Sequence, residues 1–184
     1  ALSEMLRDGV KREMAGTEVG DRLLRMYAKE PFNLVVKPMP AGIMGQYTAQ
    51  DNILAVSEDL ITRMARERGK TAQDLLSGET FDFVLNATLS TIVHEAVHQE
   101  QAVWRRDGKI PYWDVVEHEM EAKSLEAAFI LQKAAQDPKG YGRFLAENQR
   151  ASVFIREGAL LADKMRRSPK TFRMSVQADY YPAE

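Results

Sequence analysis

The residues of this sequence whose types and spacing could do chemistry lie in one short stretch, His94-Glu95-Ala96-Val97-His98. On a helix, residues i and i+4 lie on one face, so His94 and His98 would point the same way and could bind one metal ion. Zinc lowers the pKa of a bound water to about 7, and a nearby carboxylate can accept its proton as the water attacks a carbonyl. The spacing H-E-x-x-H is therefore typical of a zinc hydrolase, with Glu95 as the general base.

The composition favours a metal site over the competing interpretation, in which His94 and His98 are structural residues packed inside a helical core. The whole chain has 3 histidines, and two of them fall at this spacing with a glutamate between them. The chain has no cysteine, so any metal must be held by His, Asp or Glu.

A third ligand is expected on the next predicted helix, because zinc hydrolases commonly use two histidines and a carboxylate and leave one position open. That helix carries a run of glutamates. Its apolar positions place Glu121 within the arc that would face the histidines, where a buried carboxylate needs a partner such as a metal. We therefore predict Glu121 as the third ligand, with Glu117 and Glu119 as alternatives; Glu117 could instead accept a histidine N–H. Glu119 and Glu126 are otherwise expected on a solvated face.

These motifs resemble those of the zincin metallopeptidases, in the gluzincin-like branch where H-E-x-x-H is followed by a glutamate on a downstream helix. Glu119-Met120-Glu121-Ala122 is similar to the E-x-E-A pattern of several small bacterial metallopeptidase families. The resemblance covers about residues 32–135. It implies that His94 and His98 bind zinc, that Glu95 is the general base, and that a glutamate of the next long helix is the third ligand.

The resemblance implies two further features near the metal. In zincins an edge strand above the cleft pairs with extended peptide substrate, and residues 42–56 are the stretch that fits this role. A side chain that stabilises the transition state is also expected, and Tyr112, His118 and Tyr47 are candidates. The sequence departs from the gluzincin pattern in one respect. No frame places both a small residue three positions and an aspartate four positions after the ligand glutamate.

Helices and a small group of strands must position these residues. Hydrophobic periodicity, capping residues and breakers predict helices at residues 3–14, 17–29, 57–69, 71–77, 80–106, 112–136 and 141–167, and strands at 32–37, 42–48 and 52–56. The short loop at 107–111 predicts that the histidine and glutamate helices are antiparallel neighbours. The predicted fold is α+β, a mostly helical zincin-like domain with a small N-terminal β-meander.

Length and charge limit the function classes. A chain of 184 residues fits a single domain, residues 1–184, and contains no apolar run long enough to cross a membrane. A net charge of -2 without a dense basic block disfavours nucleic acid as a partner and leaves a peptide or protein substrate. Because the chain starts at Ala1, removal of a leader and export stay open. The alternative function is a catalytically inactive metal-binding module or a helical protein-interaction module.

Overall fold

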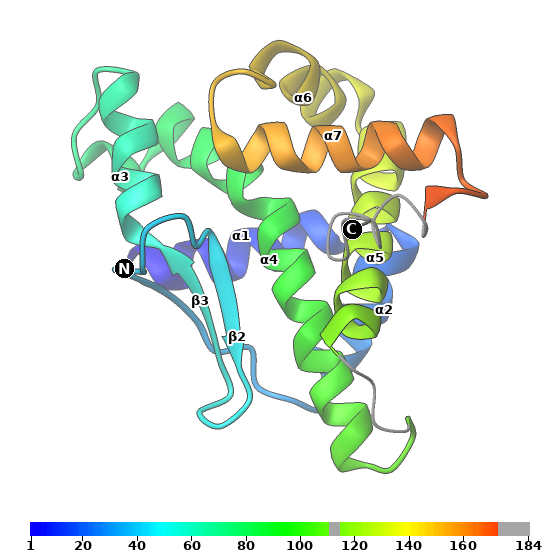
Figure 1. Ribbon diagram of the computed structural model, residues 1–184. Coiled ribbons are helices and arrows are strands. Elements are labelled where there is room, and N and C mark those ends of the chain that lie inside the picture. Colours follow the sequence, from blue (N-terminus) through cyan, green and yellow to red (C-terminus); the bar gives the residue numbers. More distant parts are fainter. Residues whose placement is uncertain (111–114, 173–184) are drawn as a thin grey trace.

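A long helix, α4 (Gly78–Arg106), runs through the centre of the molecule and carries both candidate histidines (Figure 1). Side chains are buried on nearly every side of its middle section, as expected for a helix enclosed by protein. The computed structural model describes residues 1–110 and 115–172. Within these ranges no helix combines the length and the apolar character needed to cross a membrane.

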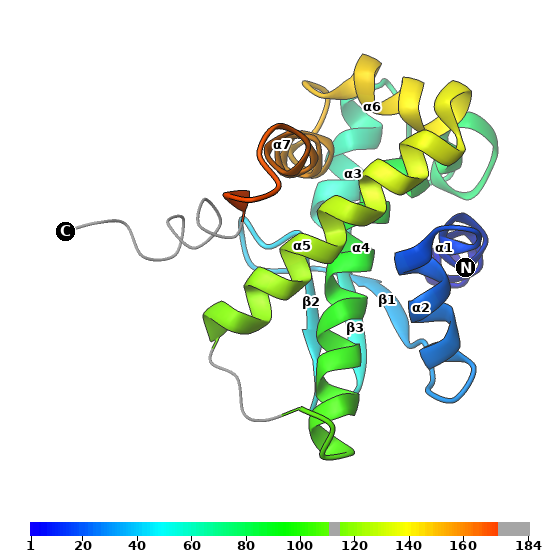
Figure 2. The same ribbon diagram turned by 90° about the vertical axis from the view of Figure 1, so that its right-hand side faces the viewer.

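The remaining elements surround α4. In chain order they are α1 (Leu2–Met14), α2 (Glu18–Tyr27), β1 (Leu34–Lys37), β2 (Gly45–Thr48), β3 (Ile53–Ser57), α3 (Glu58–Glu67), the 3-10 turn η1 (Asp74–Leu76), α5 (Val115–Gln136), the π-helical turn η2 (Pro138–Gly142), α6 (Arg143–Asn148) and α7 (Val153–Arg167). The sheet and α5 flank α4 on opposite sides (Figure 1). Helices α1 and α2 lie on the side of α4 and α5 opposite to α7 (Figure 2). The mostly helical α+β class predicted from the sequence is confirmed.

Side-chain caps begin two of the helices where the sequence predicted them. Thr17 Oγ1 accepts a hydrogen bond of 3.0 Å from the N–H of Gly20 at the start of α2. Ser57 Oγ accepts one of 3.3 Å from the N–H of Leu60 at the start of α3. Each bond satisfies an N–H group that has no partner within its own helix.

The sheet is not the predicted meander. Its strand order is β1-β3-β2, with β1 parallel and β2 antiparallel to β3. The reason lies in burial: Leu54, Ala55 and Val56 of β3 are all buried, so this strand has neighbours on both edges and both faces. β2 is only partly buried and forms an edge. The connection at 38–44 therefore passes the C-terminal end of β3, because Lys37 pairs with Ser57 and Gly45 with Val56. β2 also contacts α4.

Helix α5 is buried on three sides, which affects how its glutamates are placed. Met120 and Ala127 pack with Leu161 of α7. Gln132 accepts a hydrogen bond of 3.1 Å from the N–H of Val19 in α2. A third face meets α4. The predicted start of this helix at Tyr112 lies outside the described residues.

The predicted continuous helix at 141–167 is wrong, because two helices occupy this range. Ser152 interrupts it: its side chain accepts a hydrogen bond of 3.3 Å from the N–H of Phe154 and caps a new helix, α7. Gly158 then brings α7 close to α4, since a Cβ at this position would lie 2.8 Å from Ser90 Oγ. This break lets α7 pack against α4 at Ser90, one helical turn before His94.

Candidate metal centre

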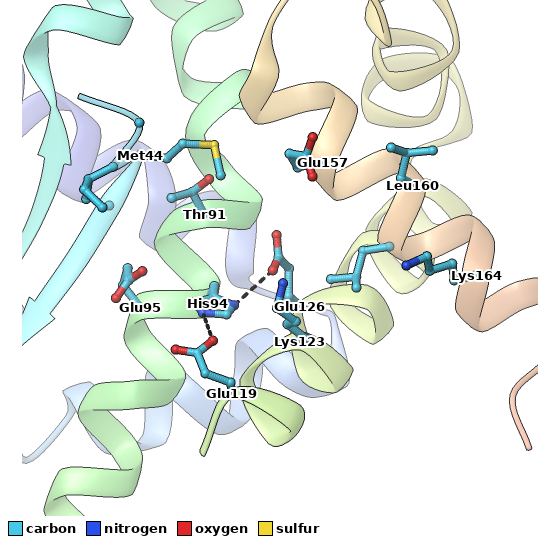
Figure 3. A pocket seen from close by; sticks show the side chains of 14 residues that line it. Met44, Thr91, His94, Glu95, Glu119, Lys123, Glu126, Glu157, Leu160 and Lys164 are labelled. Carbon is cyan, nitrogen blue, oxygen red and sulfur yellow. Dashed lines mark hydrogen bonds and ion pairs between the residues drawn. The ribbon is translucent and has the colours of Figure 1, made fainter. Parts of the chain in front are cut away.

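Three side chains meet between α4 and α5. The Nε2 atoms of His94 and His98 lie 3.1 Å apart. One carboxylate oxygen of Glu119 lies 3.2 Å from Nε2 of His94, and the other lies 3.2 Å from Nε2 of His98. Figure 3 shows Glu119 reaching from α5 toward His94. In the part of the chain that the structure describes, this is the one group of three such side chains whose ligand atoms lie close enough to hold one ion.

The second ring nitrogen of each histidine, Nδ1, contacts a side-chain oxygen of another residue. Nδ1 of His94 lies 3.0 Å from Oε2 of Glu126, and Nδ1 of His98 lies 2.9 Å from Oε1 of Gln101. These acceptors favour a proton on Nδ1, which leaves the Nε2 lone pair available to a metal. Two nitrogens bound to one tetrahedral zinc at about 2.0–2.1 Å lie roughly 3.3 Å apart. The observed spacing of 3.1 Å is close to this value. The residues present therefore fit zinc.

The carboxylates of Glu119 and Glu126 favour the protonated, positively charged form of His94. Burial disfavours the charged imidazole of His94, but hydrogen bonds to Glu119 and Glu126 outweigh it and raise the pKa of His94 to about 10. Burial also favours the neutral carboxyl of Glu119, yet His94 and His98 hold the pKa of that carboxyl well below its usual range. A pKa of about 10 favours a protonated His94 between the two carboxylates at neutral pH, and a metal that binds Nε2 would have to displace a proton.

Glu95 is held between α4 and the edge strand β2. Its carboxylate accepts a hydrogen bond of 2.7 Å from the backbone N–H of Tyr47, and burial raises the pKa of the carboxyl. β2 can approach this closely because residue 45 is glycine. A Cβ on Gly45 would lie 2.8 Å from Thr91 Cγ2 and 3.2 Å from Glu95 Cγ. The absence of a side chain at Gly45 therefore lets the backbone of β2 orient the candidate general base.

The predicted ligand Glu121 lies outside the group of convergent side chains. One of its oxygens accepts a hydrogen bond of 3.0 Å from Nε2 of Gln101, and the other lies 3.5 Å from Nη2 of Arg22. Gln101 in turn contacts His98 through its Oε1. The structure therefore brings Glu119, rather than Glu121, to the two histidines. Glu121 instead orients Gln101, and Gln101 in turn orients His98.

Glu119 and Glu126, expected on a solvated face, face α4 instead. The physical reason is that α5 buries three faces, so an apolar arc alone does not identify the one that meets the histidines. Glu117 is exposed and lies outside the group of convergent side chains. The spacing of Glu119, Ala122, Glu126 and Phe129 could have indicated the face that meets α4, because these four residues follow one helical face. On this face the two carboxylates alternate with Ala122 and Phe129, which are fully buried in the structure. No comparable pattern pointed to Gln101.

Two cavities border the convergent side chains. The smaller, of about 360 Å³, lies between the segment before β2, α5 and α7 (Figure 3). The larger, of about 830 Å³, lies between β2, the end of α4 and the first turns of α5. Gly45, Glu95 and Glu119 line both cavities, whereas His94 lines only the smaller and His98 only the larger. The candidate metal centre therefore lies between two cavities that meet at these shared residues.

The structure separates the three candidates for stabilising a transition state. The hydroxyl of Tyr47 donates a hydrogen bond of 3.1 Å to Asn52, within the turn that joins β2 and β3. His118 lines the larger cavity together with Arg105, and the two side chains lie 3.3 Å apart. Burial, followed by the charge of Arg105, lowers the pKa of His118. Tyr112 lies outside the described residues. His118, with Arg105 beside it, therefore remains a candidate for this role.

The arrangement can hold a divalent cation through two imidazoles and one carboxylate, a ligand set common in catalytic zinc sites. A further carboxylate, that of Glu95, lies beside these ligands and borders both cavities. Comparisons with protein-family models, with curated proteins and with solved structures find no match for this chain.

Proposed function

We propose that this protein is a zinc-dependent metallohydrolase, a gluzincin-like peptidase that cleaves amide bonds. The observation that carries the proposal is the convergence of His94 Nε2, His98 Nε2 and the Glu119 carboxylate, with each Nδ1 held by an acceptor. Such outer acceptors accompany metal-binding histidines in general, because they set the tautomer and the ring orientation. His94, His98 and Glu119 would hold the zinc.

The chemistry divides between the metal and the side chains around it. A zinc ion in this position supplies a Lewis acid and lowers the pKa of an attacking water. Glu95 accepts the proton of that water and passes it to the leaving amine. The backbone N–H of Tyr47 keeps the Glu95 carboxylate oriented for this transfer. His118 and Arg105 border the larger cavity and are the candidates for stabilising negative charge on the substrate carbonyl oxygen.

The position of β2 supports a peptide as the substrate. β2 pairs with β3 on one edge, and the N–H of Tyr47 on the other edge points at Glu95. Residues of β2 line the larger cavity. An edge strand beside a cleft can bind an extended peptide through main-chain hydrogen bonds, and this is the role expected for residues 42–56.

Metal content and hydrolysis test the proposal together. We expect about one zinc per chain by elemental analysis after incubation with zinc and gel filtration, and cleavage of a denatured protein or a peptide library that a chelator abolishes and zinc restores. Zinc binding without hydrolysis would favour the metal-binding module instead. Absence of zinc binding would contradict the proposal and favour the helical interaction module.

Zinc binding should release protons at a pH where an ordinary histidine releases none. With a pKa of about 10, His94 is still protonated at pH 8 in the metal-free protein, so binding of zinc must expel about one proton. The apparent zinc affinity should therefore rise roughly tenfold per pH unit between pH 7 and pH 8.5. Calorimetry in buffers of different ionisation enthalpy counts the protons. Glu126→Gln removes one supporting carboxylate and should reduce the count; release of less than about half a proton from the wild type would contradict the prediction.

Gly45→Ala should reduce hydrolysis without removing zinc. The new methyl group would clash with Thr91 Cγ2 and push β2 away from Glu95, so we expect kcat/KM to fall about tenfold, equivalent to roughly 1.4 kcal/mol. Zinc stoichiometry should stay at one per chain. The double variant with Thr91→Ser removes the clashing Cγ2 and should recover part of the activity, with Thr91→Ser alone as the control. No recovery would show that the clash is not the cause.

A further inference from the structure

The candidate metal centre lies in the middle of a cleft rather than at a closed end. The two cavities extend in different directions from Gly45, Glu95 and Glu119, which line both. His94 borders one and His98 the other, so the ligand atoms lie at the boundary between them. A substrate whose reacting bond lies at this boundary has room to continue on either side.

The charges of the smaller cavity do not single out a chain terminus. An enzyme that removes terminal residues needs a group of one charge sign that captures the terminal amine or the terminal carboxylate. The smaller cavity is lined by charged groups of both signs, Lys123 and Lys164 beside Glu126 and Glu157 (Figure 3). Glu126 is already engaged by Nδ1 of His94. The two signs offset each other, so the smaller cavity prefers neither terminus.

Apolar side chains collect around the same cleft. Four large apolar residues are exposed in the described part of the chain, and three of them line the two cavities. Ile43, at 40% exposure, and Leu160, at 53%, line the smaller cavity with Met44 and Leu161. Val115, at 72%, lines the larger one. Exposed apolar residues gathered at a cleft are typical of a binding site.

The apolar residues of the smaller cavity come from two opposite walls. Ile43 and Met44 precede β2, whereas Leu160 and Leu161 belong to α7. Figure 3 shows Met44 and Leu160 on different sides of the opening above His94. A side chain that enters between these walls would lose its contact with water on both sides, which favours an apolar side chain.

We propose that the substrate is an internal, extended stretch of polypeptide with a large apolar side chain beside the cleaved bond, held between Met44 and Leu160. This inference rests on the proposed peptidase function and deepens it. The protein is then an endopeptidase selective for residues such as Leu, Met or Phe on the side of the cleft that α7 covers. Leu160, which is exposed and therefore not needed for the core, is the residue that determines this selectivity.

Peptides with free and with blocked ends test the internal cleavage. The probe is a set of ten-residue internally quenched peptides with one central Phe, each made with free termini and with acetylated and amidated termini, cleaved by the zinc-loaded full chain. We expect kcat/KM to differ by less than about threefold between the two forms, and mass spectrometry to locate the cut next to Phe. Release of single terminal residues from the free form alone would overturn the inference.

A substitution on α7 tests the apolar selectivity. Replacing the central Phe by Ser should lower kcat/KM of the wild type at least about tenfold, in the range expected for loss of an apolar contact in a pocket. In Leu160→Ser this Phe-to-Ser ratio should fall several-fold, with zinc stoichiometry unchanged. The matched control is Leu76→Ser, because Leu76 is similarly exposed, at 41%, but lies on η1 and lines neither cavity. Equal ratios in the wild type and Leu160→Ser would overturn the role of Leu160.

The metal assay separates failure of this inference from failure of the proposed function. Zinc binding with cleavage only at chain ends, or without apolar preference, would refute the inference and leave the peptidase function standing. Zinc binding without cleavage of any peptide would refute both.

Discussion

Glu119→Gln should lower the zinc affinity at least about 100-fold, roughly 2.7 kcal/mol, whereas Glu121→Gln should lower it no more than about tenfold. The carboxylate oxygens of Glu119 lie 3.2 Å from the Nε2 atoms of both histidines, so the amide would remove an anionic ligand. Glu121 reaches His98 only through Gln101. Titration against a chromophoric chelator at fixed pH measures both affinities.

Glu121→Gln is the matched control for Glu119→Gln, because each variant replaces a partly buried glutamate of α5 by its isosteric amide. Thermal unfolding of the metal-free variants checks that each is folded. Equal losses of affinity would mean that both glutamates act only by orienting other groups. A larger loss in Glu121→Gln would restore Glu121 as the ligand and contradict the arrangement of α5.

Glu95→Gln should abolish hydrolysis while zinc stays bound. Loss of a general base costs about 10²–10⁴-fold in rate, so we expect kcat to fall about 1000-fold or more. The Gln side chain keeps an oxygen that can accept the hydrogen bond from Tyr47, so β2 should stay in place. The zinc affinity should change less than about threefold, because Glu95 is not among the convergent ligand atoms.

Glu79→Gln is the matched control for this variant. Glu79 lies in the first turn of the same helix, α4, and is exposed. We expect its activity and zinc content to equal those of the wild type. A Glu95→Gln variant that retains more than about a tenth of the activity would contradict the assignment of Glu95 as the general base.

Several features followed from the sequence because their causes are local. The side-by-side placement of His94 and His98, with Glu95 between them in sequence, depends on little more than helical periodicity. The helix starts at Thr17 and Ser57 depend on one hydroxyl and a backbone N–H three residues away. The mostly helical composition with a small sheet follows from apolar periodicities over ten to twenty residues. These features were predicted correctly.

The identity of the third candidate ligand and the position of β2 depend on contacts between residues far apart in the sequence. The sequence by itself determined that two histidines share a helical face and that a glutamate-rich helix follows. It did not determine that Glu119 meets them, because this depends on which of the three buried faces of α5 turns toward α4. Nor did it determine that β2 lies at the sheet edge, where Gly45 lets its backbone reach Glu95. Such contacts join residues about 25 to 50 positions apart. The period of a single helix shows which residues share a face, but it does not determine which neighbour that face meets.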